Sequence, residues 1–426
     1  MVFCSKHLLY ALVICLGPIT FGNICVYPSP TGTEIRKLHN LPDDSMAWAF
    51  YNGVTSLTAI LGPFFNELLF RIFHNSRKKT AFTISVLCVI SWFSILLTKF
   101  SIWAGIACRT IMGVLLGSIS SLSPMYLVEI APKGFTGLYG SFNQLSIAIS
   151  YSLLNFLGPY LNYIELCYYS AVFPFLEALL IWFVPETSKE ARELKIGKTE
   201  QIQHIQTHPK EKLFQKKNAQ GLIIGLALNF IQQWSGISAF ITNMTDMMKN
   251  SGLNLSPSNQ AGIVQLSQCI ACIISCFFID KIGRRLAWTC SCLGASFFLF
   301  LNAINGVYGW SSVIPILSLF MFQFSYGIGI GTIPWFIIPE YFDYAIRSEA
   351  TGFCIAFNWL MSFGVIFIWP IMNSNIGQNN SFFVFMGICI LGVFFGLFGL
   401  KEPLSQEVES TLLATLPISS DETTNL

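Results

Sequence analysis

Long apolar segments separated by short polar stretches recur along the whole chain. Twelve of these segments are roughly 18 to 26 residues long, close to the length of about 20 residues that an α-helix needs to cross the hydrocarbon core of a bilayer. The pattern therefore predicts twelve transmembrane helices, at residues 8–27, 47–70, 81–98, 102–128, 138–158, 166–184, 219–241, 261–279, 287–308, 313–338, 350–371 and 382–400. The first segment could instead be a signal sequence with Lys6 as its basic flank, but no cleavage-like pattern of small residues follows it.

The fourth predicted helix and the turn after it carry the most information. Arg109 stands near the start of this helix and Glu129 at its end, where the turn E-I-A-P-K-G-F-T-G follows. Charges on an apolar helix are costly to bury, so we expect them to be paired or to serve a function. Gly113 and Gly117 are four residues apart and form a face of small residues, which predicts close contact with another helix.

The composition agrees with a polytopic membrane protein. Apolar residues make up 53% of the 426 residues and charged residues 11%, whereas soluble domains carry about 25% charged residues. A net charge of +2 gives no reason to expect nucleic acid or another polyanion as a partner. The predicted fold class is all-α, with the lipid bilayer as its surroundings.

Lys and Arg are distributed unevenly between the two sides of the predicted helices. If both termini face the cytoplasm, 19 of the 24 lie on the cytoplasmic side and four in outer loops. Such a bias sets the orientation of membrane proteins. The two N-x-S/T acceptor patterns, at Asn254 and Asn379, fall in outer loops. We expect a multi-pass protein of the plasma membrane with both termini in the cytoplasm.

A polar stretch divides the chain into two halves of six helices. The expected parts are an N-terminal bundle at 1–184, a cytoplasmic linker at 185–218, a C-terminal bundle at 219–401 and a cytoplasmic tail at 402–426. His204 and His208 in the linker are four residues apart, but without a third ligand a solvated helix face explains them better. The 13 cysteines lie mostly in apolar segments, where Cys packs as a small hydrophobe. Neither a metal nor a cofactor is expected.

The two halves repeat the same pattern of charges. S-R-K-K at 76–79 corresponds to D-K-I-G-R-R at 280–285, Glu129 corresponds to Glu340, and P-E-T at 185–187 corresponds to K-E-P at 401–403. A duplicated six-helix unit places a substrate site between the halves near mid-membrane. The charges are expected to join helix ends, holding one facing state and loosening in the other. The predicted gating and ion-pair residues are Arg77, Arg109, Glu129, Glu186, Asp280, Arg284, Arg285, Glu340, Arg347 and Glu402.

Amide side chains at membrane depth are the most informative polar residues. An amide both donates and accepts hydrogen bonds, as a neutral polyhydroxylated ligand requires, and an aromatic face can cover the apolar side of a sugar ring. Any single amide could instead bond a neighbouring helix, but six together favour a binding site. The six are Gln144, Gln232, Gln233, Gln265, Gln268 and Asn358.

The tenth predicted helix is rich in Gly and Pro. Gly329, Gly331, Pro334 and Pro339 surround Trp335. These residues weaken a transmembrane helix unless neighbours or water satisfy its backbone, so we expect the helix to bend here and line a cavity. Close packing alone would explain the glycines but not the two prolines.

The order of the motifs resembles the sugar porter family of the major facilitator superfamily over residues 60–402. The resemblance implies a major facilitator fold of two six-helix pseudo-repeats, and transport of a hexose or a related small neutral polyol by alternating access. The motifs are R-x3-G-x3-G followed by P-x-Y-x2-E-I-A-P at 109–132, Q-Q-W-S-G-I at 232–237, D-x2-G-R-R at 280–285, P-W-x4-E-x6-R at 334–347 and N-W at 358–359.

The resemblance also implies a set of substrate ligands and shows where this chain departs from the family. Ser238 and Ser362 replace what is commonly Asn, and Gly327 stands where many members have Glu, so a roomier pocket is expected. Thr136 replaces an Arg, which leaves Glu129 dependent on Arg77 or its neighbours. The implied ligands are Gln144, Gln232, Gln233, Ser238, Gln268, Trp335 and Ser362, with Asn358 as a further amide.

The first helix suggests how transport is driven. Residues 21–24 read F-G-N-I, whereas proton-coupled members carry F-G-Y-D. Coupling to protons needs a titratable group that reaches the central cavity. Glu177 is the carboxylate well inside a predicted span, and it lies in the sixth helix, which is peripheral in the family. We interpret Glu177 as a buried partner for a neighbour and expect facilitative transport, with a proton-coupled symporter as the alternative.

Two other functional classes fit less well. An enzyme needs a convergent set of acid, base, nucleophile or metal, and the apolar segments contain almost no His and no paired carboxylates. A nutrient receptor of transporter fold would usually need a signalling tail, and residues 402–426 are short and polar. We therefore expect a transporter that functions as a monomer, and not an enzyme.

Overall fold

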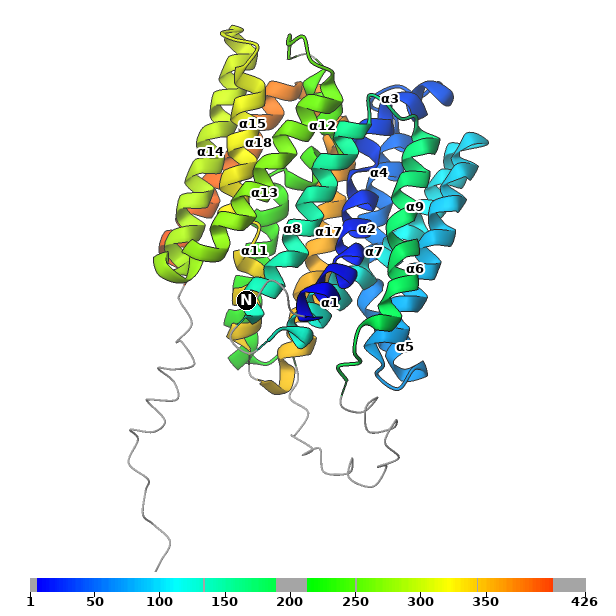
Figure 1. The fold of residues 1–426 in the computed structure, drawn as a ribbon. Coiled ribbons are helices and arrows are strands. Elements are labelled where there is room, and N and C mark those ends of the chain that lie inside the picture. Colours follow the sequence, from blue (N-terminus) through cyan, green and yellow to red (C-terminus); the bar gives the residue numbers. More distant parts are fainter. Residues whose placement is uncertain (1–5, 133–134, 189–212, 250, 343, 401–426) are drawn as a thin grey trace, which may run out of the picture.

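Helices form all of the regular structure in the part of the chain that the computed structural model describes, residues 6–132, 135–188, 213–249, 251–342 and 344–400. They stand side by side along one common direction, with most helices of the C-terminal half on one side of the molecule and those of the N-terminal half on the other (Figure 1). Across these ranges the helices group into twelve segments of membrane length, six in each half. This confirms the predicted fold class.

Most of the twelve segments contain a break or a change of helix type. Those of the N-terminal half are α1 (Lys6–Ile14) with α2 (Leu16–Val26) and α3 (Pro28–Leu38), α4 (Met46–Ala59) with α5 (Gly62–Ile72), α6 (Arg77–Ser94) with η2 (Ile95–Lys99), α7 (Ile102–Ile130), α8 (Thr136–Leu157), and α9 (Tyr163–Leu180) with η3 (Ile181–Phe183). Those of the C-terminal half, after the short turn η5 (Lys216–Asn218), are α11 (Ala219–Trp234) with α12 (Ile237–Met248), α13 (Pro257–Ile282), α14 (Arg284–Tyr308), α15 (Ile314–Ile328) with α16 (Ile333–Ile337) and η6 (Ile338–Tyr341), α17 (Tyr344–Ile376), and α18 (Gln378–Phe394) with η7 (Phe395–Gly399).

Ten of the segments are apolar enough to cross a membrane on length and composition alone. Nine of them pass as single spans, and α4 with α5, bent by 45°, makes a tenth. Of the other two, α8 is 22 residues long and more polar, and α13 is 26 residues long, with the side chains of its last residues, 276–282, outside the described part of the chain. Their polar side chains are buried where these two helices meet, because Ser152 of α8 donates to the Gly262 carbonyl at 2.8 Å and Ser258 of α13 to the Asn155 carbonyl at 2.7 Å.

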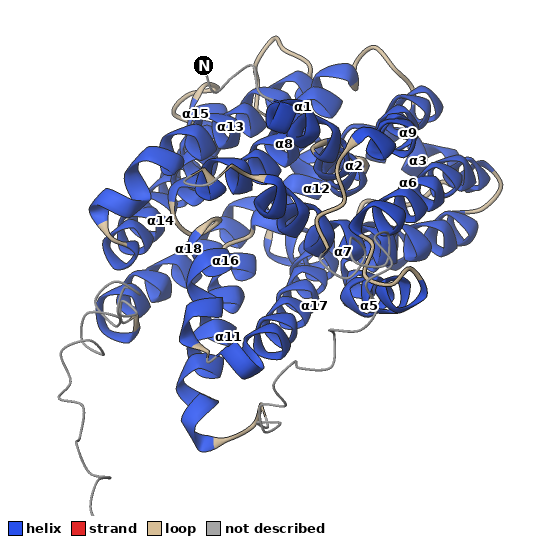
Figure 2. Cartoon of the chain, turned by 60° about the horizontal axis from the view of Figure 1, so that its bottom comes forward, coloured by secondary structure: helices blue, strands red, loops and turns tan. Residues whose placement is uncertain are grey.

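The bundle has two ends, which we call the α3 face and the α5 face. The α3 face carries α3 and the starts of α4, α13 and α15, and it is at the top of Figure 1. The α5 face carries the start of α1, the end of α5 and the starts of α6 and α14. Figure 2 shows the bundle with the α5 face turned forward.

Four helix pairs make most of the contact between the two halves. The contacts are those of α8 with α13, of α4 with α17, and of α12 with both α2 and α3. Figure 1 shows α8 and α17 in the middle of the bundle, between the two halves. Any site between the halves must therefore be built on these helices and on those packed directly behind them.

The seventh segment breaks where the sequence predicted a continuous helix. The expected span at 219–241 is divided into α11 and α12 at Ser235 and Gly236, and Gly236 has a φ of +97°. Only glycine adopts this left-handed conformation without steric cost. The segment is mostly apolar before Gln232 and after Ser238, so its length and composition predicted a single span.

Helices α4 and α7 approach each other at glycines. A Cβ added to Gly117 would overlap with the carbonyl group of Ala59, and one added to Gly113 would overlap with the Thr58 hydroxyl and the Thr55 backbone. The face of small residues predicted from the sequence is confirmed as a helix contact. On the opposite side of the same contact, a Cβ on Gly62 would overlap with the backbone of Gly117.

The first prediction concerns this contact. Gly117→Ala should lower the melting temperature of the detergent-solubilised protein, because the overlap is with backbone and overpacking of this kind costs about 1 to 3 kcal/mol. Gly352→Ala on α17 is the matched control, because its added Cβ has no heavy atom within 4 Å, and Ala favours a helix over Gly. Equal melting temperatures for the two variants would contradict the close contact.

Candidate functional site

A cluster of amide side chains lies where α11 and α17 meet. Asn358 of α17 is its centre: its Nδ2 donates to Asn229 Oδ1 at 2.8 Å and to Gln232 Oε1 at 2.7 Å. Its Oδ1 accepts from Gln233 Nε2 at 2.9 Å. All four side chains are buried. A buried amide without partners is costly, so the four hold one another in place.

The cluster also holds the break in the tenth segment. Gln232 Nε2 donates to the carbonyl oxygens of Ile330 at 2.9 Å and Gly331 at 3.2 Å, in the gap between α15 and α16. Ser291 of α14 accepts from the Ile330 backbone N–H at 2.9 Å. The helix is therefore interrupted where the glycines and prolines predicted a bend, and side chains from α11 and α14 satisfy the freed backbone groups. Helix α16 packs beside α11 (Figure 2).

A row of serines continues the cluster into the N-terminal half. Ser238, in the first turn of α12, donates to Gln233 Oε1. Its hydroxyl lies 2.9 Å from that of Ser362 on α17, which lies 3.1 Å from that of Ser56 on α4. Five residues predicted as ligands therefore share one hydrogen-bond chain: Gln232, Gln233, Ser238, Asn358 and Ser362.

The other predicted ligands lie outside this chain. Trp335 is half-buried and faces a narrow apolar pocket that Asn229 also lines. Gln144 is half-buried on α8, whereas Gln268 on α13 is buried and its Oε1 has no hydrogen-bond partner in the described part of the chain. Beside Gln268 the space is closed: a Cβ on Gly327 would lie 2.7 Å from that of Ala271. The roomier pocket expected at Gly327 is not found, because α13 packs against this position.

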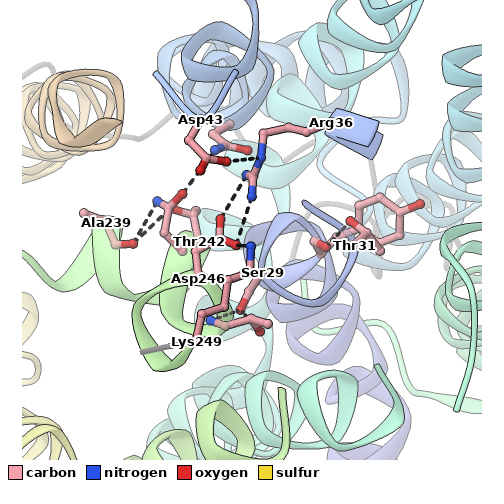
Figure 3. A network of polar contacts seen from close by, with 12 residues as sticks. Ser29, Thr31, Arg36, Asp43, Ala239, Thr242, Asp246 and Lys249 are labelled. Atoms are coloured by element: carbon pink, nitrogen blue, oxygen red, sulfur yellow. Dashed lines mark hydrogen bonds and ion pairs between the residues drawn. The ribbon is translucent and has the colours of Figure 1, made fainter. Parts of the chain in front are cut away.

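An ion pair joins the halves at the α3 face. Arg36 of α3 is 4% exposed, and its guanidinium lies 2.9 Å from Asp246 of α12 and 3.0 Å from Asp43 (Figure 3). Its Cζ is 4.9 Å from the ring centre of Trp48, and Lys249 lies 2.7 Å from Asp246. We call Arg36, Asp43 and Asp246 the α3-face latch.

Neutral hydrogen bonds reinforce the latch. Ser29 donates to Asn155 Oδ1 at 2.9 Å and meets the Thr245 hydroxyl at 2.9 Å. Asn52 of α4 donates to Asn243 of α12 at 3.4 Å. Each set links the N-terminal half to α12, so the α3 face is closed by polar contacts between the halves.

At the α5 face of the N-terminal half, the predicted charges bind one another. Arg77 Nη2 lies 3.3 Å from Glu129, which also accepts from the Thr187 hydroxyl. Glu186 accepts from the Ser76 hydroxyl and from the Arg77 backbone N–H, the latter at 3.0 Å. Glu129 therefore pairs with Arg77, as expected from the absence of a basic residue at 136.

The C-terminal half repeats this arrangement with different partners. Arg284 pairs with Glu340. Arg285 donates to carbonyl oxygens of η7, and Arg347 to the Phe342 carbonyl at 3.2 Å. Each of these contacts stays inside one half, unlike the pair of Arg36 with Asp246 in the α3-face latch.

For three of the predicted ion-pair residues, Arg109, Asp280 and Glu402, the described part of the chain shows no ion pair. Arg109 is fully buried and has no carboxylate partner in the described ranges. Its Nε donates to the Tyr51 carbonyl at 2.6 Å, and its Cζ lies 4.9 Å from the Tyr51 ring centre. It joins α7 to α4 and lies away from the helix ends. The Asp280 side chain and Glu402 fall outside the described residues.

Glu177 lies deep inside the N-terminal half. It is 6% exposed and accepts from the Ser85 hydroxyl of α6 at 2.9 Å. A Cβ on Gly17 of α2 would lie 3.0 Å from its Oε1. Its helix, α9, packs on α2 and α6 and is absent from the helix pairs that join the halves.

Sequence reasoning missed Asn229, Ser56, Arg36 and Asp246. Asn229 could have been found, because it lies one turn before Gln232 and Gln233 on the same helix. The charge of Arg36 was assigned to a loop, although Ser29, Gly32 and Arg36 share one face of a helix that starts at Pro28. Nothing in the sequence near Asp246 indicates its ion pair, because its partner Arg36 is 210 residues away.

Comparison with known proteins shows to which family the chain belongs. Residues 20–411 match the family described as sugar (and other) transporter. A facilitated trehalose transporter of Bombyx mori is 26% identical over 96% of this chain and 86% of its own length. The sugar transporter ERD6-like 1 of Arabidopsis thaliana is 27% identical over 91% of this chain and 89% of its own length.

Solved structures show the same fold. A crystal structure of a D-xylose–proton symporter has a TM-score of 0.79 at 20% identity, covering 94% of this chain and 99% of that one. The inward-open conformation of the xylose transporter XylE from E. coli has a TM-score of 0.78 at 20% identity and covers 95% and 100%. Together with the family match over nearly the whole length, this identifies the chain as a membrane transporter of the sugar (and other) transporter family, with the major facilitator fold.

Proposed function

We propose that this protein moves a hexose or a related small neutral polyol across the membrane by alternating access, down its gradient. The observation that carries the proposal is the uncharged hydrogen-bond chain between the halves, which runs from Ser56 through Gln233 to Asn358. Hydroxyl and amide groups match the donors and acceptors of a sugar, and no ionised side chain belongs to the chain. The printed names of similar proteins, among them a facilitated trehalose transporter, support a sugar as the substrate.

The ligand would bind against the Gln233 and Ser238 side of the chain. Trp335 would cover an apolar face of the sugar ring. Gln144 on α8 and Gln268 on α13 would reach the ligand from the helices that join the halves. The break bearing Gly329, Gly331, Pro334 and Pro339 is proposed as the hinge of the tenth helix, because its freed backbone groups are held by side chains that can exchange partners.

The transport cycle would alternate between closing the α3 face and closing the α5 face. Among the described residues, the polar contacts between the halves gather at the α3 face and reach down to Ser56, whereas the ion pairs described at the α5 face, Arg77 with Glu129 and Arg284 with Glu340, each join residues of one half. Opening the α3 face must break the pair of Arg36 with Asp246. We assign the α3 face to the outside and both termini to the cytoplasm of a plasma-membrane protein, following the distribution of Lys and Arg.

A single chain supplies every part of this mechanism, so we propose that the monomer is the transporting unit. A non-transporting nutrient receptor and a proton-coupled symporter remain the alternatives that the experiments below separate. No enzymatic activity is assigned. Of the two glycosylation acceptors, Asn254 is exposed at the α3 face, whereas Asn379 is half-buried beside Gly306.

The second prediction tests the site. Vesicles containing the purified protein should equilibrate a labelled sugar from a panel of hexoses, pentoses, polyols and trehalose faster than protein-free vesicles. Gln233→Ala should weaken its affinity by about 1 to 3 kcal/mol, because the ligand and Asn358 each lose a partner. Gln220→Ala, an exposed position on the same helix, is the control. Unchanged affinity in well-expressed Gln233→Ala would show that the site is misplaced, and no flux of any sugar would favour the receptor.

The third prediction concerns energy coupling. An imposed pH gradient should not drive the sugar above equilibrium, because no carboxylate belongs to the chain between the halves and Glu177 is buried behind it. Glu177→Gln should therefore leave both uptake and exchange unchanged relative to wild type. Accumulation driven by the gradient, lost in Glu177→Gln while exchange persists, would make the protein a symporter with Glu177 as the coupling residue.

The fourth prediction concerns the α3-face latch. Asp246→Asn should shift the equilibrium toward opening of that face by roughly 1 to 3 kcal/mol, because Arg36 loses its carboxylate on the other half; the partial exposure of Asp246 makes the loss smaller than for a fully buried pair. Faster hydrogen–deuterium exchange in α3 and α12 would report the shift.

Glu67→Gln is the control for the latch variant, because Glu67 pairs with Arg71 inside one exposed helix. It should leave exchange in α3 and α12 unchanged. Equal exchange in Asp246→Asn and Glu67→Gln would rule out the latch as a determinant of the closed state.

A further inference from the structure

Two amide side chains of the C-terminal half are buried without any hydrogen-bond partner. In the described part of the chain, neither the Nε2 nor the Oε1 of Gln265 on α13 and of Gln323 on α15 has a partner. Both residues are 0% exposed. Asn66 shows the more ordinary case, because its Oδ1 is unpartnered but its Nδ2 donates to the Ser118 carbonyl at 2.8 Å.

An amide in this condition destabilises the fold. Each buried polar group that lacks a partner costs about 1 to 3 kcal/mol, and an apolar side chain of similar length at position 323 would avoid that cost. A buried unpaired group therefore calls for an explanation outside the packing of the protein. Because the Gln323 amide is bonded to nothing, it can turn toward a new partner without breaking a hydrogen bond.

Gln323 lies on the part of α15 that faces both α12 and α13. On one side of it, the ring of Phe322 packs against that of Phe240 on α12, with centres 5.1 Å apart. On the other side, a Cβ added to Gly327 would lie 2.7 Å from the Cβ of Ala271 on α13. At 3.6 residues per turn, position 323 falls between these two directions on the helix surface.

Both of these neighbouring helices carry residues of the candidate site. Ser238 stands in the first turn of α12, and the Gln268 Cγ on α13 would lie 3.8 Å from a Cβ added to Gly327. Helices α13 and α15 both start at the α3 face and run in the same direction. Gln268 and Gln323 each come about one turn before the contact of α13 with Gly327, so they lie at a similar depth.

Gln265 extends this group of amides toward the N-terminal half. It lies one turn before Gln268 and three residues after Gly262, whose carbonyl accepts from Ser152 of α8 at 2.8 Å. The amides of Gln265, Gln268 and Gln323 therefore run from the contact of α15 with α13 to the contact of α13 with α8. The latter is one of the contacts between the halves, where alternating access would admit a ligand.

We propose that Gln323 is a further ligand of the transported sugar, bound on the side of the site formed by α13 and α15. Neighbouring hydroxyls of a sugar present a donor and an acceptor side by side, which is what one amide requires. Gln323 is neither among the six amides identified from the sequence nor in the ligand set that the family resemblance implies. This inference rests on the proposed function.

The interruption of the tenth segment gives Gln323 a way to reach the ligand. Gln323 comes about one and a half turns before Gly329, where α15 ends and the proposed hinge begins. Bending at the hinge would change how α15 lies against α13 and give the side chain room to turn. The amide would then exchange an unpaired state for hydrogen bonds to the sugar, so its burial cost in the empty site favours binding.

The first measurement is made on the solubilised protein without sugar. Gln323→Met keeps the length of the side chain and should melt at or above the wild-type temperature, because it breaks no hydrogen bond and removes an unpaired amide. Asn66→Leu is the matched control and should melt lower, because it breaks bonds to the Ser118 carbonyl and the Ser121 hydroxyl at 2.8 and 2.7 Å. An equal drop in both variants would make Gln323 a structural residue and overturn the proposal.

The second measurement compares D-glucose, or the sugar of the panel that binds best, with its deoxy analogues at each hydroxyl. In the wild type, at least one analogue should bind about 2- to 13-fold more weakly, the range expected for one hydrogen bond. In Gln323→Met the parent sugar should bind more weakly by a similar factor, and the difference at that hydroxyl should fall to within about twofold, as for a coupled pair. Asn66→Leu should keep the wild-type pattern.

Discrimination in Gln323→Met that matches the wild type at every hydroxyl would overturn the proposal, whatever the affinity, and would leave an ordered water as the partner of Gln323. The sugar as substrate would stand in that case, because the wild type still binds it. If the wild type binds no sugar of the panel, the proposed function is refuted and this proposal with it.

Discussion

A polar group buried between lipid-facing helices is costly unless it finds a partner inside the protein, and the Asn358 amide is where this constraint is met for several helices at once. It joins α11 to α17 and, through Gln232, supports the interrupted backbone between α15 and α16. Removing such a hub would leave donors and acceptors unpaired in a region of low dielectric, at a cost larger than the bonds themselves contribute in water. The amide cluster thus connects several helices, and a ligand bound at this candidate site would act on the helices that form it.

Buried polar and charged groups are paired differently at the two ends of the molecule. At the α3 face, buried charges and hydroxyls are paired across the halves, whereas the two ion pairs described at the α5 face each lie within one half. Contacts across the halves have to be broken and remade when the halves rotate, and contacts within a half can persist. The contacts described at the α3 face are those expected of a transporter closed at that end. The ion pairs at the other end preserve the shape of each bundle.

Much of the fold could be predicted because it depends on local pattern. Membrane-length apolar segments marked the helices, and the glycines and prolines around Trp335 marked the break between α15 and α16. The break at Gly236 was hidden because it lies within one largely apolar segment of membrane length. Arg36 with Asp246, and Ser56 with Ser362, could not be found, since each pair depends on how two separately folded bundles face each other. The ligands implied by family resemblance fell into a connected group in the C-terminal half and a scattered group on α8, α13 and α16.

The glycine contact between α4 and α7 has a mechanical consequence. Helix α4 is pressed against α7 at Gly113 and Gly117, with Arg109 bonded to the carbonyl of Tyr51, and it presents Ser56 on the side that meets α17. Because α4 is closely packed against α7, it cannot shift by itself when the contact between Ser56 and Ser362 is lost. The displacement is passed to the rest of the six-helix bundle, which rotates as a rigid body. Loss of a single hydroxyl contact between the halves can in this way produce a movement at both ends of the bundle.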